Sequence, residues 1–258
     1  MTFFDSVIMG IVEGLTEFLP ISSTAHLIIT AKLLNLAHTD YMKSFEISIQ
    51  TGAILAVVVM YWKELFTNME TVKRLIVTFI PTGALGFAFY KVVKGYLLGN
   101  GSVIAWAFVI GGVVLIAFEM LHREKDDAIE EISRLPYAQC VMIGFFQALA
   151  MIPGVSRSGI TIIGGLLLGL RRRLIVEFSF LLAVPTMFSA TAYDLYKSGG
   201  AFSLEQFGSL AAGFVMSFIV AMGCIKFFLR YIRRHTFIPF GVYRIIAGAA
   251  LLAGLLPS

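Results

Sequence analysis

The sequence predicts an all-α integral membrane protein, with about six transmembrane helices and two re-entrant broken helix pairs in an inverted-topology repeat. Composition is the first reason: 58% of the 258 residues are hydrophobic and only 14% are charged, whereas soluble domains carry roughly 25% charged residues. The mean hydropathy is accordingly high, at +0.87. The other two reasons are the lengths of the apolar runs and the positions at which two of them are broken.

Six apolar runs have the length of about 20 residues that a helix needs to cross a bilayer. They lie at residues 44–62, 72–91, 102–121, 174–195, 207–229 and 239–257. Two other apolar regions, 3–37 and 138–170, are interrupted near the middle by Pro, Gly and Ser. Irregular backbone at membrane depth is tolerated only where it is buried in protein or lines a cavity. Each region is therefore predicted to be a pair of half-helices that meet inside the membrane.

The two broken regions indicate an internal duplication. Shifting the second by 134 positions produces these pairs: Gly10 with Gly144, Glu13 with Gln147, Leu15 with Leu149, and Ser22 with Ser156. The predicted organisation is one membrane domain, with a first repeat at 1–121, a charged cytoplasmic linker at 122–136 and a second repeat at 137–258. Because three spans follow each broken pair, the second copy enters the membrane inverted, and the site is expected where the two breaks meet.

Lys and Arg residues between the runs predict the orientation, because basic loops are retained in the cytoplasm. Twelve basic residues fall on one side and five on the other, so the first side is assigned to the cytoplasm and both termini lie outside. The larger set is Lys63, Lys73, Arg74, Arg123, Lys125, Arg134, Arg171, Arg172, Arg173, Arg230, Arg233 and Arg234. The smaller set is Lys32, Lys43, Lys91, Lys94 and Lys197.

Other charged features are given structural interpretations. The three arginines at residues 171–173 are predicted to anchor the topology, with lipid headgroup binding as the lesser alternative. Arg244, about one turn into the last predicted span, is expected to snorkel to the cytoplasmic interface. The linker is predicted to be a solvated loop or a surface helix.

The first broken region carries acids, hydroxyls and a histidine. Glu13 and Glu17 are four residues apart and share one face of a helix. Pro20 ends this helix, and the hydroxyls of residues 22–24 follow it, with His26 one turn into the next helix. An isolated charge in hydrocarbon costs at least ~2.5 kcal/mol, so two glutamates here indicate a polar cavity with a function.

The second broken region has the composition of a phosphate site. Gly154 and Gly159 allow a ligand to approach the backbone, and Ser156 and Ser158 can cap the following half-helix, whose N-terminal N–H groups favour an anion. Arg157 adds a bidentate clamp inside the break. A structural role for Arg157, as a partner for a glutamate or for carbonyl groups, is the alternative.

The two copies have diverged in the groups that carry chemistry. Glu17 aligns with Met151, His26 with Ile160, and Arg157 with Ser23. The acids and the histidine therefore come from the first copy and the arginine from the second. This division predicts one composite site suited to phosphoryl chemistry, in which charge stabilisation and positioning dominate.

Both motifs resemble those of the bacterial undecaprenyl-diphosphate phosphatases, the bacitracin-resistance family. Residues 13–26 (EGLTEFLPISSTAH) resemble its glutamate-rich first motif and residues 153–161 (PGVSRSGIT) its second, and the similarity extends to residues 45–53 and 178–185. The resemblance implies hydrolysis of a polyprenyl diphosphate lipid, bacitracin resistance, and a multi-pass protein of the bacterial inner membrane with its active site open to the outer face. A homodimer is plausible, and no nucleic-acid partner is expected.

The resemblance also allows roles to be assigned as hypotheses. Arg157 holds the diphosphate, and Glu13 and Glu17 either bind a divalent cation (Mg²⁺ or Ca²⁺) or act as base and orienter; no organic cofactor is expected. The nucleophile is Ser23 with His26 or Glu17 as base, with a phosphohistidine at His26 or direct attack by water as alternatives. The expected substrate-binding set is Glu13, Ser22, Gly154, Ser156, Ser158 and Thr161. A transporter or flippase of undecaprenyl phosphate is the rival reading, because inverted repeats with broken helices are typical of transporters.

Overall fold

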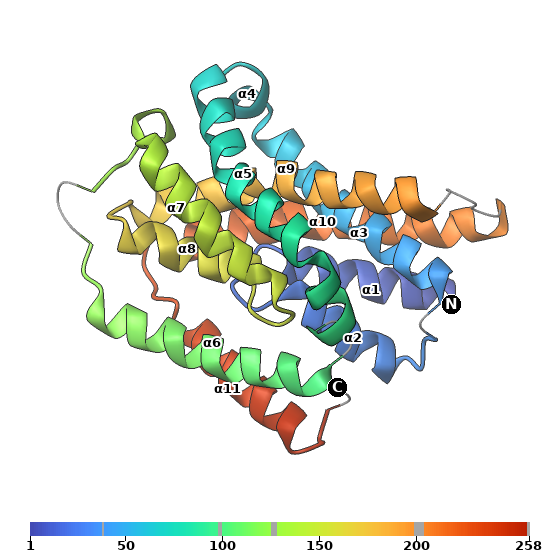
Figure 1. The fold of residues 1–258 in the computed structure, drawn as a ribbon. Helices are drawn as coiled ribbons and strands as arrows, with labels where there is room; N and C mark the ends of the chain where they lie inside the picture. The colour runs from blue at the N-terminus through green and yellow to red at the C-terminus, as the bar shows by residue number, and fades with distance from the viewer. Residues whose placement is uncertain (38, 98–99, 125–127, 199–203, 257–258) are drawn as a thin grey trace.

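A computed structural model describes residues 1–37, 39–97, 100–124, 128–198 and 204–256, and in these residues the regular structure is helical apart from one isolated bridge between Ile129 and Leu170 (Figure 1). Five helices within the described residues are long and apolar enough to cross a membrane. The prediction of a multi-pass membrane protein is therefore confirmed. The five are α3 (Asp40–Met60), α5 (Met69–Val92), α6 (Gly101–Leu121), α9 (Arg172–Ser198) and α10 (Leu204–Tyr231).

The sixth expected span is shorter than predicted. In its place lies α11 (Ile238–Leu252), a helix of 15 residues that begins with Pro239 in its first turn and is followed by Gly254 with φ of 69°. At 1.5 Å per residue this helix is about 22 Å long, less than the hydrocarbon thickness of about 30 Å. Helix α11 is packed along α6, as Figure 1 shows. A Cβ at Gly112 of α6 would lie 2.6 Å from the carbonyl oxygen of Gly241, so the two backbones are in close contact.

Both broken regions contain the expected pairs of short helices. The first consists of α1 (Phe3–Thr16) and α2 (Ser23–Leu33), separated by residues 17–22, which we call the first break. The second consists of α7 (Tyr137–Ala148), a 3₁₀ turn (Leu149–Met151) and α8 (Arg157–Leu167), with residues 152–156 as the second break. Thr2 and Asp5 form a reciprocal capping box at the start of α1, which explains where this helix begins.

The helices of the two halves correspond in position and in packing. Helix α8 starts and ends 134 residues after α2, at the offset that aligns the two motifs. Helix α1 packs along α10, and α7, which occupies the place of α1 in the second half, packs along α5. Helices α3 and α9 also contact each other near the centre. Each broken pair thus lies against a long helix from the other half. This packing of each broken pair against the other half brings the two breaks together. The division into residues 1–121, 122–136 and 137–258 stays a prediction.

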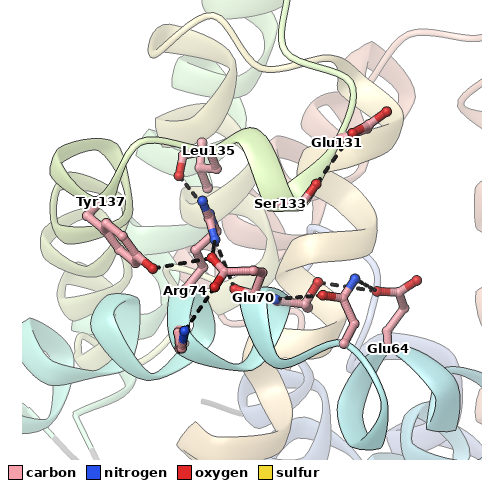
Figure 2. Close-up of polar contacts among 10 residues, drawn as sticks. Glu64, Glu70, Arg74, Glu131, Ser133, Leu135 and Tyr137 are labelled. Carbon is pink, nitrogen blue, oxygen red and sulfur yellow. Dashed lines mark hydrogen bonds and ion pairs between the residues drawn. The ribbon is translucent and has the colours of Figure 1, made fainter.

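The second half of the linker is irregular, with one 3₁₀ turn (Ile132–Arg134). Figure 2 shows how it is held: Arg74 of α5 donates from Nε to the carbonyl oxygen of Leu135 at 2.8 Å and from Nη1 to the carboxylate of Glu70 at 2.6 Å. The guanidinium group also lies over the ring of Tyr137, 4.9 Å from its centroid. A short helix that the apolar pattern did not predict, α4 (Trp62–Phe66), leads into α5 and is bonded to it through Glu64.

The largest apolar core lies between the spans and behind the breaks. Phe18 of the first break is fully buried and meets Phe180 of α9 edge to face, with ring centroids 5.2 Å apart. The ring of Phe180 in turn contacts that of Phe228 in α10, and Phe228 contacts Phe237. Aromatic packing of this kind stabilises beyond the area it buries. It fixes the first break against α9, the helix that also holds the arginine of the second break.

Candidate active site

Each break places a serine in a strained backbone conformation at the start of a half-helix. Ser22 has φ of 69° and Ser156 has φ of 76°, values that residues other than glycine seldom adopt. Such positions cost about 1–3 kcal/mol each and cluster at functional sites. Ser156 Oγ caps α8 by accepting a hydrogen bond from the N–H of Gly159 at 3.2 Å. Helices α2 and α8 therefore both begin at the breaks, where the N–H groups of their first turns favour an anion.

The acid of the first break and the arginine of the second form one cluster. Arg157 Nη2 lies 2.9 Å from Glu17 Oε1, and Ser23 Oγ donates to Glu17 Oε2 at 2.5 Å. Glu17 and Ser23 are each 7% exposed. Arg157 is held on its other side by the carbonyl oxygen of Ser179 in α9, 2.6 Å from Nη1. The structure thus brings together Glu17, Ser23 and Arg157, as the composite-site prediction requires.

Glu13 lies near this cluster as a buried carboxylate. Its side chain is fully buried, and neither carboxylate oxygen has a hydrogen-bond partner among the described residues. It interacts electrostatically with Glu17, Glu46 and Arg157. A charged group that is buried without a partner is costly, so this carboxylate has coordinating capacity that the fold leaves unused. Among the described residues no three His, Cys, Asp or Glu side chains are grouped to hold a metal ion. Two carboxylates together with substrate phosphates suit Mg²⁺, which is usually bound by few protein ligands.

His26 faces away from Ser23. Its Nδ1 lies 2.7 Å from the carbonyl oxygen of Ser22, and its Nε2 lies 2.5 Å from the hydroxyl of Tyr243 in α11, whose ring stacks on the imidazole at 5.6 Å. A carbonyl oxygen only accepts, so Nδ1 is assigned the proton, and in the neutral ring Nε2 accepts from Tyr243. Neither nitrogen is directed at the Ser23 hydroxyl, although the spacing of three residues suggested that contact.

Two of the remaining predicted binding residues, Ser158 and Thr161, donate their hydroxyls to backbone carbonyl oxygens. Ser158 Oγ donates to the carbonyl oxygen of Leu19 at 2.7 Å and so ties the second break to the first. Thr161 Oγ1 donates to the carbonyl oxygen of Arg157 within its own helix, also at 2.7 Å. Gly154 has φ of 93°, which explains glycine there. Ser22 makes no capping hydrogen bond with its side chain. These residues shape the break more directly than they present donors.

Arg244 is the residue whose role the sequence interpretation missed. It is 2% exposed and does not snorkel. Its Nη1 donates to the carbonyl oxygens of Pro20 and Val155, and its Nη2 to those of Gly154 and Ala107, at 2.8–3.1 Å. The prediction of an interfacial position is wrong because the carbonyl groups at both breaks lack helical partners, and a buried guanidinium can satisfy several of them. An arginine within an apolar run was the signal that could have identified it.

Known proteins resemble this chain over nearly its whole length. The family model described as bacitracin resistance protein BacA matches residues 6–250. The undecaprenyl-diphosphatase of Aquifex aeolicus is 52% identical over 253 residues, and that of Wolinella succinogenes is 53% identical over 252 residues. In both cases the similarity covers 98% of this chain and 98% of the relative. Both breaks fall inside the matched regions.

Proposed function

Because the chain belongs to the family of bacitracin resistance protein BacA, we propose that it hydrolyses undecaprenyl diphosphate to undecaprenyl phosphate and inorganic phosphate. The observation that carries this proposal is the contact of Glu17 with both Ser23 and Arg157 across the two breaks. It joins a hydroxyl, a base and a phosphate-binding cation in one buried place. The activity recycles a lipid carrier and accounts for bacitracin resistance, since the antibiotic sequesters the diphosphate form.

The geometry supports Ser23 as nucleophile and Glu17 as its base. The Ser23 oxygen attacks the terminal phosphorus, its proton passes to Glu17, and the bond from that phosphorus to the bridging oxygen breaks. Undecaprenyl phosphate leaves with the electron pair of that bond and takes the proton from Glu17. Water then attacks the phosphoserine, giving one proton to Glu17 and releasing inorganic phosphate as Ser23 regains its hydrogen. His26 takes no part in these transfers, because both its nitrogens are engaged elsewhere.

Arg157 is the group proposed to hold the diphosphate. Its Nε is buried and has no hydrogen-bond partner among the described residues, so this N–H is a donor available to a phosphate oxygen. The N–H groups at the start of α8 add further donors. Donors that are already oriented towards developing charge stabilise the transition state without reorganising.

A divalent cation, Mg²⁺ or Ca²⁺, would be held by Glu13, with Glu17 as the second ligand in the alternative scheme in which Glu17 is not the base, and it would neutralise charge on the phosphates. The two oxygens of Glu13, buried and without partners among the described residues, support this assignment.

The part of the isoprenoid chain nearest the headgroup is proposed to occupy an apolar cavity of about 480 Å³ beside the breaks. Its lining includes Pro20 of the first break, Val155 of the second, and Trp106, Ile110 and Val114 of α6. These three α6 side chains are among the exposed apolar residues, so the cavity opens towards lipid. A tail lying there leaves the headgroup at the breaks.

The proposed topology is an inverted repeat with both termini and the active site on the outer face of the bacterial cell membrane. The matching helix positions of the two halves and the loop charges support it. Gly248 of α11 contacts Ala105 of α6, and Gly241 contacts Gly112, so α11 runs antiparallel to α6 and the chain returns to the side where α6 begins. A homodimer, which the family resemblance implies, remains part of this proposal.

Release of inorganic phosphate from undecaprenyl diphosphate in detergent tests the function. Wild type is compared with Glu17→Ala and Arg157→Ala, with EDTA and with added Mg²⁺ or Ca²⁺. The exposed ion pair Arg134–Glu131, 3.0 Å apart, supplies the matched controls Arg134→Ala and Glu131→Ala. We expect release by wild type and controls and its loss in both site variants. Folded wild type that releases no phosphate but moves undecaprenyl phosphate across vesicles would establish the transporter instead.

A further inference from the structure

A charged concavity lies away from the breaks, where the ends of several helices meet. It has a volume of about 410 Å³ and is formed by the loop that leads from α8 into α9, the loop between α10 and α11, and Glu124 after α6. Among the described residues its wall carries five arginines, one histidine and a single acid: Arg171, Arg172, Arg173, Arg233, Arg234, His235 and Glu124. We call it the arginine pocket, and we propose that it binds the phosphate of an anionic phospholipid headgroup.

The acids that pair with the first three arginines stand outside the pocket wall. Arg171 pairs with Glu130, Arg172 with Glu119 and Arg173 with Glu177, each at 2.7–2.8 Å. None of these three glutamates lines the pocket. A guanidinium has five N–H donors, so the single carboxylate paired with Arg172 and the one paired with Arg173 do not use all of them.

Arg233 and Arg234 carry charge that no described acid neutralises. Both side chains are exposed, and within the described part of the chain neither has an ion-pair partner. The acid in the pocket wall, Glu124, is already committed, since its Oε1 accepts the backbone N–H of Arg172 at 2.7 Å and so caps α9. The pocket therefore keeps two unneutralised guanidinium groups, which suit a phosphate.

The position of the pocket favours a lipid as the source of that phosphate. Arg172 is the first residue of one candidate membrane span, and Tyr231 is the last residue of another. The pocket lies directly beyond both ends, at the level of the headgroups. One turn into the membrane from Tyr231, Phe227 is 57% exposed and offers an apolar surface for acyl chains. Basic pockets between the ends of membrane helices are typical sites for anionic lipid headgroups.

The arginine pocket is separate from the catalytic cluster. Helix α8 runs from Arg157 to Leu167, and the arginines of residues 171–173 follow it. Eleven helical residues span about 16 Å. A phosphate bound in the arginine pocket is therefore not the substrate phosphate held by Arg157, and the inference does not depend on the proposed reaction.

The test measures binding of phosphatidylglycerol and phosphatidylethanolamine to the full chain in detergent, by native mass spectrometry and by thermal unfolding. The double variant Arg233→Gln/Arg234→Gln is compared with Lys32→Gln/Lys91→Gln, two exposed lysines outside the pocket that remove the same charge. We expect wild type to prefer phosphatidylglycerol and the arginine variant to bind it roughly 30-fold more weakly, the factor for two basic residues at a membrane surface. The lysine control should keep the preference.

Three results would overturn the proposal. Equal loss in the lysine control would show a general charge effect, and equal affinity for the two lipids would show that the net negative charge of the headgroup is not recognised. Stabilisation by inorganic phosphate alone, equal to that by the lipid at the same concentration, would identify a free anion as the ligand. Glu124→Gln removes the one acid among the described residues of the wall and should tighten phosphatidylglycerol binding.

Discussion

The two breaks share a backbone and differ in side chains. Ser22 and Ser156 occupy equivalent positions and have nearly the same φ, 69° and 76°. Each precedes a half-helix of 11 residues. The first residue of that half-helix is Ser23 in one copy and Arg157 in the other, so the proposed nucleophile and the phosphate clamp occupy the same structural position. A duplicated scaffold has thus provided two chemically different groups for one site.

The residues one turn before each break differ in the same way. Glu13 is buried with both oxygens lacking partners among the described residues. Its counterpart Gln147 donates from Nε2 to Thr82 Oγ1 at 3.0 Å and to Thr186 Oγ1 at 3.2 Å, while its Oε1 has no partner among the described residues. A buried carboxylate without any hydrogen bond is costlier than an amide that makes two. The second copy therefore uses this position to join neighbouring helices, while the first keeps an unbonded carboxylate that is available for function.

The largest expected effect comes from removing the hydroxyl of Ser23, the first residue of the half-helix α2. Ser23→Ala should lower kcat by at least about 10³, the scale on which nucleophile variants retain only residual catalysis. Phosphate release and trapping of a phosphoserine with radiolabelled substrate measure this. Ser217→Ala, which removes a buried hydroxyl that donates to the carbonyl oxygen of Ile49 outside the predicted site, is the control. A Ser23→Ala enzyme that works near the wild-type rate would exclude Ser23 as the nucleophile and would favour direct attack by water.

Arg244→Gln tests whether the two breaks must be held together. The variant loses donors to the carbonyls of Pro20, Gly154 and Val155, and displacements of about 1 Å at a reacting centre can cost 10² in rate. Gly111→Ala is a companion, because a Cβ there would lie 2.8 Å from Cζ of Arg244. We expect both variants to lower kcat and the temperature of unfolding. An unchanged unfolding temperature and rate in Arg244→Gln would contradict the assignment.

Exchanging the residues one turn before the breaks should have a smaller effect. Glu13→Gln removes a cation ligand, and losses of about 10–100-fold are typical for groups that support metal binding. The dependence of the rate on added Mg²⁺ should weaken at the same time. Gln147→Glu places a carboxylate where the amide Nε2 now donates to two hydroxyls, and should lower stability without changing the dependence of the rate on Mg²⁺. Full Mg²⁺ response in Glu13→Gln would remove this residue from the cation site.

The smallest effect is expected at the contact between the first half-helix and α11. Tyr243→Phe removes the hydroxyl bonded to His26 Nε2 and keeps the stacked ring. If the whole hydrogen bond, worth about 1 kcal/mol, supports the transition state, the rate falls roughly fivefold. His26→Ala should cost little more. A loss of thousands in His26→Ala, with Tyr243→Phe unaffected, would instead support chemistry at the imidazole.

The membrane class, the five long helices and the two breaks could be predicted from the sequence. Each depends on local properties: the length of an apolar run, the missing N–H of proline, and the capping capacity of serine. The pairing of Glu17 with Arg157 was also foreseeable, because the two copies had divided acids and arginine between them. The helices and the breaks are determined by neighbouring residues, whereas the Glu17–Arg157 pair follows from the comparison of the two copies.

The tertiary structure decided where the long polar side chains go. His26 was expected to serve Ser23 but bonds to Tyr243, and Arg244 was expected at the interface but joins both breaks. In each case the deciding partner is remote in sequence. A buried donor takes whichever acceptor the packed helices bring within about 3 Å, and only the packing of the two halves determines which acceptor that is.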